Sequence, residues 1–156
     1  MTKTIVRFVR ENGSDFGIKV PEYQTPGASG ADIRANIPLS IRSFGIDLVP
    51  NKPTLIPTGF SVQIPRGLEI QIRPRSGFAL RHAVSVINSP GTIDSDYRGE
   101  VGVIMINLGN KIFHINHGDR IAQIVVAPVI HASFQVVEAL EKSDRATRGF
   151  GSTGIS

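Results

Sequence analysis

Short runs of alternating or continuous apolar residues dominate the chain, and helical periodicity is almost missing. The strict alternation Leu-Glu-Ile-Gln-Ile-Arg at 68–73 predicts a half-buried strand. The one helical turn that we expect runs from Gly77 to His82. Other β-rich runs predict strands at 5–9, 31–35, 55–64, 84–87, 101–108, 112–115, 121–129 and 134–137.

Turn-forming clusters of Gly, Pro, Asn and Asp separate these runs, for example at 26–30, 65–67 and 116–119. This spacing is typical of antiparallel sheets. We therefore expect an all-β fold, a jelly-roll-like barrel or sandwich with one short helix. Because the composition changes after Leu140, we expect one β-barrel domain over 1–140 and a flexible glycine-rich tail over 141–156.

The overall composition fits one domain: 156 residues, of which 40% are apolar. The absence of cysteine excludes disulfides, thiolate metal sites and cysteine nucleophiles. No apolar run approaches the roughly 20 residues of a membrane-spanning helix, and no signal peptide is recognisable. We expect a soluble, cytoplasmic protein without a membrane partner.

The net charge of +4 favours polyanionic ligands, which include nucleic acid, membrane surfaces and phosphorylated small molecules. However, the 17 Lys and Arg residues are scattered, and only 6% of residues are aromatic. A base-stacking surface would have few members. This pattern favours a solvated basic surface over a nucleic-acid face, so we expect no nucleic-acid partner.

Candidate chemistry begins at Arg75-Ser76-Gly77, which follows a predicted strand and opens the helical turn. Backbone N–H groups, a hydroxyl and a guanidinium would meet there at a positive helix start, as in a phosphate cradle. The alternative is an ordinary N-cap serine, which the three residues taken alone favour.

A second candidate is the segment 88–100, which holds three acidic residues, one tyrosine and two glycines between predicted strands. A tight hairpin would bring Asp94 and Tyr97 to one loop, where a carboxylate orients water and a ring packs against a sugar-like ligand. A calcium loop is an alternative, but the later ligands of an EF-hand are missing. A plain surface loop without a ligand is the other alternative.

The tail is the third candidate, because 145–154 combines two arginines, hydroxyl side chains, glycines and Phe150. These groups suit closure over a phosphorylated aromatic ligand, with Phe150 covering a base. The residues alone favour a disordered terminus. The four histidines show no metal-ligand arrangement beyond the pair His114 and His117 flanking a turn, so we expect structural or surface roles for them.

Five segments, taken in order, resemble the motifs of the trimeric dUTPase family. They are 31–35, 74–77, 91–100, 118–123 and the glycine-rich tail, and together they span 31–154. The segment 91–100 reproduces the family's uridine- and water-binding hairpin almost letter for letter. The resemblance therefore changes the interpretation of the tail from a disordered terminus to a catalytic lid.

The resemblance implies hydrolysis of dUTP to dUMP and pyrophosphate, with Asp94 orienting and deprotonating the attacking water. It implies that Mg²⁺ binds mainly through the triphosphate and water, with Asp32 contacting it through water. Arg145 would act like an arginine finger. The groups that would hold the phosphates are Arg75, Ser76, Gly77, Gln123, Gly151 and Ser152.

For selectivity, the resemblance implies that Tyr97 packs under the sugar and excludes a 2′-hydroxyl. Asn88 and the hairpin backbone at Gly91, Thr92 and Ile93 would read the uracil edge, and Phe150 would cover the base. Family members are homotrimers whose sites lie between subunits, so we expect the same assembly here.

The tail departs from the family pattern, because Ala146 and Arg148 stand where two glycines are usual. A side chain at a position that needs positive φ costs about 1 kcal/mol or more. Two alternative functions remain: a dCTP deaminase, which Asp94 and Tyr97 argue against, and a noncatalytic nucleotide-binding regulator.

Overall fold

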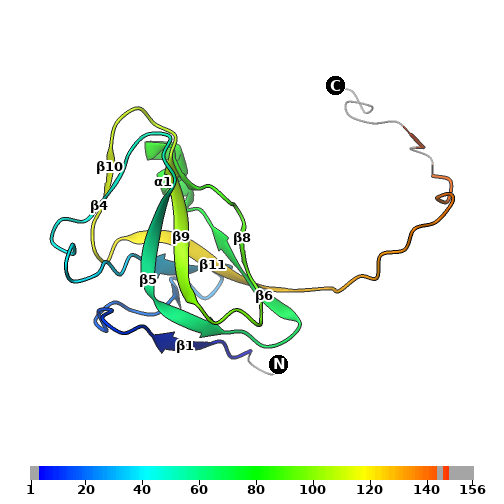
Figure 1. Ribbon diagram of the computed structural model, residues 1–156, viewed down its shortest axis with the longest axis horizontal. Coiled ribbons are helices and arrows are strands. Elements are labelled where there is room, and N and C mark those ends of the chain that lie inside the picture. Colours follow the sequence, from blue (N-terminus) through cyan, green and yellow to red (C-terminus); the bar gives the residue numbers. More distant parts are fainter. Residues whose placement is uncertain (1–3, 144–145, 148–156) are drawn as a thin grey trace.

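The computed structural model describes residues 4–143 and 146–147. Two sheets, ordered β1-β5-β9-β7 and β2-β3-β11-β6-β8, pack around one core, and β10 pairs with β4 (Figure 1). In chain order the elements are β1 (Arg7–Arg10), β2 (Glu22–Tyr23), β3 (Ala31–Arg34), β4 (Ile46–Leu48), β5 (Thr54–Gln63), β6 (Leu68–Arg73), α1 (Ser76–His82), β7 (Val84–Val86), β8 (Gly91–Ile93), β9 (Glu100–Asn107), β10 (Phe113–Ile115) and β11 (Arg120–Pro128).

Alternating apolar residues build the core between the two sheets. In β6 the side chains of Ile70 and Ile72 are buried, whereas Arg73 points outward. In β9 the residues Val103 and Met105 are buried in the same alternating way. Each such side chain contributes roughly 1.5–3 kcal/mol by leaving water. The expected all-β, jelly-roll-like fold is confirmed.

One predicted strand is wrong. Residues 134–137 lie in an extended segment, 130–143, that leaves the barrel (Figure 1). Phe134 is 95% exposed and Val136 fully exposed. Their composition favours a strand, but a strand needs a partner, and none of the described strands pairs with them. Conversely, β2, β4 and β8 were not predicted, since two or three residues are too few to show a period.

The predicted helical turn is α1, which begins one residue earlier than expected. It ends at Ala83, whose φ of 54° is left-handed. Phe78 holds the helix against β10, because its ring meets Phe113 edge-on at 5.2 Å between centroids. Across the described part of the chain, no helix has the length and apolar character needed to cross a membrane.

A buried polar cluster fastens the segment 11–18 to the barrel. Asn36 is 3% exposed; its Oδ1 accepts a hydrogen bond from the Asp15 N–H at 2.9 Å, and its Nδ2 donates to the Asp15 carbonyl at 3.0 Å. His117 Nε2 lies 3.1 Å from Asp15 Oδ2. Because the Ile37 N–H donates to His117 Nδ1, Nε2 carries the hydrogen and donates to the carboxylate.

This cluster predicts an acid-sensitive stability. The Gly17 N–H and His117 hold the pKa of Asp15 below its usual range, and Arg42 adds to the effect. Such a carboxyl stabilises the fold above its unfolded pKa of about 4, and the contribution is lost as the pH falls through the lower folded value. Asp15→Asn should therefore lower the free energy of unfolding at pH 7 and flatten its acid dependence below roughly pH 5.

Chemical denaturation between neutral and acidic pH measures both effects. Glu138→Gln, at an exposed position of the extended segment, is the matched control. Parallel acid curves for the wild-type protein and Asp15→Asn would contradict the assignment.

Candidate active site

The three inner strands of the five-stranded sheet, β3, β11 and β6, place candidate phosphate-binding residues side by side. Gln123 of β11 is the register partner of both Asp32 on β3 and Arg73 on β6. Gln123 Nε2 donates to the Pro74 carbonyl at 3.0 Å, and the chain enters α1 two residues later. The strands thus gather a group that we call the arginine cluster: Asp32, Arg75, Ser76, Gly77 and Gln123.

Asp32 is the centre of the arginine cluster. Its Oδ2 lies 3.1 Å from Arg120 Nη1, and its Oδ1 lies 3.5 Å from Arg75 Nε. Arg75 Nη1 also donates to the Arg120 carbonyl at 2.9 Å. Two guanidinium groups around one carboxylate leave a net positive charge that suits a polyphosphate. Asp32 therefore holds Arg75 in place.

The start of α1 adds backbone donors to the cluster. Arg75 occupies the N-cap position, and Ser76 is the first helical residue. No side chain caps this end, so the capping role considered for Ser76 is not observed. The first N–H groups of a helix have no partner within the helix, so those of Ser76 and Gly77 can donate to an anion.

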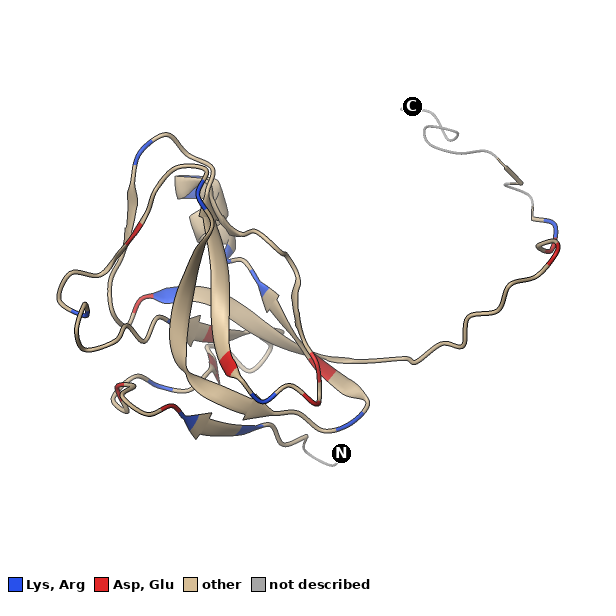
Figure 2. Ribbon diagram, viewed as in Figure 1, with Lys and Arg blue, Asp and Glu red and all other residues tan. Residues whose placement is uncertain are grey.

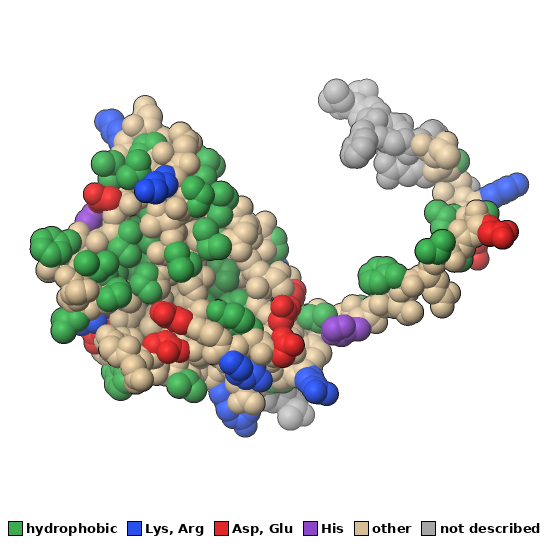
Figure 3. Space-filling model, viewed as in Figure 1, with side chains coloured by type: hydrophobic (Ala, Val, Ile, Leu, Met, Phe, Trp, Pro, Cys, Tyr) green, Lys and Arg blue, Asp and Glu red, His purple; other side chains and the backbone are tan. Residues whose placement is uncertain are grey.

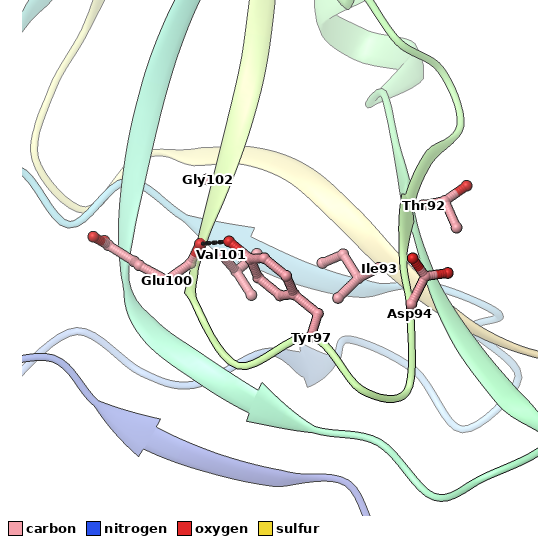
Figure 4. Close-up of a pocket in the computed structure, with 7 residues that line it drawn as sticks. All are labelled: Thr92, Ile93, Asp94, Tyr97, Glu100, Val101 and Gly102. Carbon is pink, nitrogen blue, oxygen red and sulfur yellow. Dashed lines mark hydrogen bonds between the residues drawn. The ribbon is translucent and has the colours of Figure 1, made fainter.

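The connection between β8 and β9 lines a separate pocket of about 230 Å³, which we call the hairpin pocket after the expected motif (Figure 4). Asp94 and Tyr97 lie in one loop there, but the expected hairpin pairing is wrong, because β8 pairs with β6 in one sheet and β9 with β5 and β7 in the other. Asp94 directly follows β8, and Ile93 lies between it and the ring of Tyr97 (Figure 4). Tyr97 Oη donates to the Glu100 carbonyl at 2.9 Å. The pocket is lined by Thr92, Ile93, Asp94, Tyr97, Glu100, Val101 and Gly102.

Asn88 lies beside β8, the strand that directly precedes Asp94. A Cβ added to Gly91 would stand 3.1 Å from Asn88 Nδ2 and 3.3 Å from Ile72 Cβ. The missing side chain therefore lets the amide approach the backbone of β8. This arrangement leaves the Asn88 amide next to the hairpin residues predicted to read a base.

Within one chain, β6 separates the hairpin pocket from the arginine cluster. Ile93 pairs with Ile70, so Asp94 lies level with Glu69, and both line one pocket. The arginine cluster begins beyond the other end of β6. Four residues of strand, from Glu69 to Arg73, span roughly 13 Å at about 3.3 Å each. In Figure 2 the helix α1 lies at one end of the barrel and the acidic segments at the β8–β9 connection lie toward the other end.

Within the glycine-rich motif of the tail, the structure describes Ala146 and Thr147. Arg145, Arg148, Phe150, Gly151 and Ser152 lie outside the described residues. Ala146 has a φ of 46°, in the left-handed region. Its N–H donates to the Ser143 carbonyl at 2.9 Å. A side chain thus occupies a conformation that glycine adopts at roughly 1 kcal/mol lower cost.

In the part of the chain that the structure describes, histidine and carboxylate side chains do not converge on a metal site. Among residues 4–143 and 146–147, no three or more of them are grouped to hold an ion. His114 bonds Asp47 at 2.7 Å and His117 bonds Asp15, so the two histidines serve different contacts. Asp32 is the one carboxylate that the arginine cluster offers to a metal, and both its oxygens already meet guanidinium groups.

Two residues that support the candidate site were missed by the sequence reasoning: Arg120, which binds Asp32, and Glu100, which binds Tyr97. The Arg120 contact joins residues 88 positions apart, and only the pairing of β3 with β11 reveals it. Glu100 acts through its carbonyl, which no side-chain pattern reports.

The sequence matches the family model for dUTPase over residues 17–154. It is 57% identical to the deoxyuridine 5'-triphosphate nucleotidohydrolase of Roseobacter denitrificans over 143 residues, which are 92% of this chain and 91% of the relative. It is 54% identical to the protein of that name from Chlamydia pneumoniae, covering 91% of this chain and 95% of the relative.

The fold also matches solved structures. The dUTPase of Staphylococcus bacteriophage 80alpha, solved with dUpNHpp, superposes with a TM-score of 0.81 at 22% identity, over 98% of this chain and all of the phage chain. A dUTPase from phage phi11 of S. aureus superposes with a TM-score of 0.72 at 21% identity, over 88% and 99% of the two chains. The match to the family model and the full-length relatives show that this chain belongs to the dUTPase family.

Proposed function

We propose that this chain hydrolyses dUTP to dUMP and pyrophosphate, which keeps uracil out of DNA and supplies dUMP for thymidylate synthesis. Family membership and full-length relatives named deoxyuridine 5'-triphosphate nucleotidohydrolase, at more than half identity, support this reaction. The observation that carries the mechanism is the hairpin pocket, where the Asp94 carboxylate and the Tyr97 ring line one cavity. The substrate is soluble, and we place the reaction in the cytoplasm.

In the proposed mechanism, Asp94 orients a water and accepts its proton as the water attacks the α-phosphorus in line. The bond from that phosphorus to the β-phosphate oxygen breaks, and pyrophosphate leaves. Negative charge grows on the departing phosphates. Arg75, Gln123 and the N–H groups of Ser76 and Gly77 bind these oxygens, and Asp32 and Arg120 hold Arg75 in position.

The phosphates would bring Mg²⁺ with them. The donor set fits this arrangement, because Asp32 is the one carboxylate of the arginine cluster and both its oxygens already meet guanidinium groups. Asp32 would contact the ion through water. When bound, Mg²⁺ would neutralise phosphate charge. The related dUTPase of phage phi11 coordinates a structural Mg(II) ion.

Substrate selectivity would come from the hairpin. Tyr97 would pack under the deoxyribose and leave no room for a 2′-hydroxyl. The backbone of Gly91, Thr92 and Ile93 would read the uracil edge together with the Asn88 amide. A site that hydrogen-bonds its substrate rejects a wrong donor and acceptor pattern strongly, so cytosine should be excluded.

We propose that each active site is shared between subunits of a homotrimer. Within one chain Asp94 is level with Glu69, four strand residues or roughly 13 Å from Arg73, so a water that it orients would not reach phosphates held by the arginine cluster. A neighbouring chain can supply the missing half. The outer face of the β5–β9 sheet is apolar: Leu55 and Ile104 are register partners, 63% and 37% exposed, and Figure 3 shows apolar side chains across this side.

The tail over 141–156 would close the site as a lid, and the barrel over 1–140 would carry the rest. Arg145 would neutralise phosphate charge, Phe150 would cover the uracil, and Gly151 with Ser152 would wrap the terminal phosphate. The extended segment 130–143 already carries the chain away from its own barrel (Figure 1). That course supports delivery of the tail to a neighbouring subunit.

Asp94→Asn tests the reaction and its base. An amide cannot accept the water's proton, so pyrophosphate release from dUTP with Mg²⁺ should fall by about 10²–10⁴-fold. Wild-type protein assayed beside dTTP, dCTP and UTP should release pyrophosphate rapidly from dUTP alone. Ammonia release from dCTP would instead indicate a deaminase, and tight dUTP binding without turnover would indicate a regulator.

Ile104→Glu tests the assembly. A carboxylate on the apolar sheet face should break the trimer, since burying an unpaired charge is costly. Sedimentation should give three times the 16.8 kDa chain mass for the wild-type protein and the single-chain mass for the variant, with loss of activity. Lys52→Glu, at an exposed turn before β5, is the charged control. A fully active wild-type monomer would refute the shared site.

Ala146→Gly tests the lid. Glycine removes a left-handed conformational cost of about 1 kcal/mol, which corresponds to about fivefold in the closing equilibrium. If closure retains this conformation, kcat/KM for dUTP should rise by up to that factor in stopped-flow assays. Ala132→Gly, in the extended segment, is the control for added backbone freedom. An equal effect in both variants would assign the change to flexibility alone.

A further inference from the structure

The ring of Tyr97 is held in one orientation by contacts with the residues that directly follow it in the chain. Its hydroxyl donates to the Glu100 carbonyl three residues later, at 2.9 Å (Figure 4). The side chain is nevertheless 44% exposed, so core packing alone does not fix it. Local contacts must therefore define where the ring lies in the hairpin pocket.

Gly99 provides the first of these contacts by having no side chain. A Cβ added there would lie 2.5 Å from Tyr97 Oη and 2.8 Å from its Cζ. Both distances are shorter than real Cβ contacts, so something must shift. The backbone at Gly99 directly precedes β9, whose first residue is Glu100, whereas the ring turns about two side-chain bonds. The ring would therefore move, and its bond to the Glu100 carbonyl would break.

Glu100 provides the second contact and ties it to the barrel. Its Oε1 accepts a hydrogen bond from the Gly59 N–H of β5 at 2.9 Å. The β5–β9 register shifts between Pro57 and Ser61, and Gly59 has a φ of 72° at this irregularity. A Cβ on Gly59 would lie 2.5 Å from Asn36 Nδ2, so the buried Asn36 packs directly against the backbone of this irregularity. The carbonyl that receives the Tyr97 hydroxyl thus belongs to an anchored residue.

We propose that Gly99 and Glu100 are positioning residues for Tyr97, and that this arrangement determines how strongly the site rejects a 2′-hydroxyl. The specificity part rests on the proposed function, because it assumes that the ring packs under the sugar. The positioning part rests on the contacts of the ligand-free chain alone. The two parts therefore have separate tests.

The positioning part can be tested without substrate. The protein contains two tyrosines, Tyr23 and Tyr97, so protein labelled with carbon-13 at the tyrosine Cζ alone gives two tyrosine signals, and Tyr97→Phe identifies each. Gly99→Ala and Glu100→Ala should shift the Tyr97 signal and leave the Tyr23 signal in place. Glu100→Gln should match the wild-type protein, since its amide oxygen still accepts from Gly59.

Gly27→Ala is the matched control, because a Cβ there meets nothing within 4 Å. It should leave both signals in place. An unmoved Tyr97 signal in both Gly99→Ala and Glu100→Ala would overturn the positioning role. Thermal unfolding of each variant identifies any that fails to fold, and Glu100→Ala then carries the test in place of Gly99→Ala.

The specificity part is tested by the ratio of kcat/KM for dUTP to kcat/KM for UTP. Gly99→Ala and Glu100→Ala should lower this ratio by about tenfold, the scale of one hydrogen bond that holds the ring. Glu100→Gln and Gly27→Ala should retain the wild-type ratio. A parallel fall for both nucleotides would assign a merely structural role to the two residues and overturn the specificity part.

The outcomes also separate this inference from the proposed function. If the wild-type protein hydrolysed no dUTP but the Tyr97 signal shifted as expected, the proposed function would fail and the positioning role would stand. If the wild-type protein were active but the variants kept both the signal and the ratio, the inference alone would fail.

Discussion

The register of β11 between β3 and β6 is the constraint on which the candidate site depends. It sets Gln123 beside Asp32 on one side and beside Arg73 on the other, although these residues are far apart in sequence. A slip of one residue would turn every side chain of β11 to the opposite face. The buried Ile121 and Ile124 oppose such a slip, because either would be exposed to water. Core packing thus fixes the arrangement of charges on the inner strands β3, β11 and β6.

The length of β6 has an equally direct consequence for function. The strand pairs with β8 through Ile70–Ile72, which sets Asp94 level with Glu69 near its beginning, and it delivers the chain to α1 at its end. The hairpin pocket and the arginine cluster consequently face different parts of the surface. In the assembly that we propose, a second chain completes the site, and the outer apolar face of the other sheet sets its position. The six-residue strand β6 then links the fold to that proposed assembly.

Features carried by contiguous residues were predictable from sequence. The alternation at 68–73 predicted β6 from end to end, and the segment 91–100 predicted one loop holding Asp94 and Tyr97, which line one pocket. The hairpin pairing expected around that loop was wrong, because β8 and β9 lie in different sheets. Contacts formed by distant segments were not: the Arg120–Asp32 ion pair depends on strand pairing, and the Glu100 carbonyl carries no side-chain signal. The strand expected at 134–137 failed for a related reason. Local composition favours extended backbone, but only a partner strand makes it a sheet.

The charges of the hairpin pocket and of the arginine cluster suit their separation within one chain. Glu69, Asp94 and Asp96 line one pocket beside the hairpin, so this region repels a triphosphate. A neutral uridine group can bind there, and its phosphates need arginines from elsewhere. Placing Arg75 next to Asp94 in the same chain would satisfy the carboxylate with a permanent ion pair and weaken it as a base. Here Arg75 is instead paired with Asp32. In the trimer that we propose, the Asp94 carboxylate would then act on water once a neighbouring subunit completes the site.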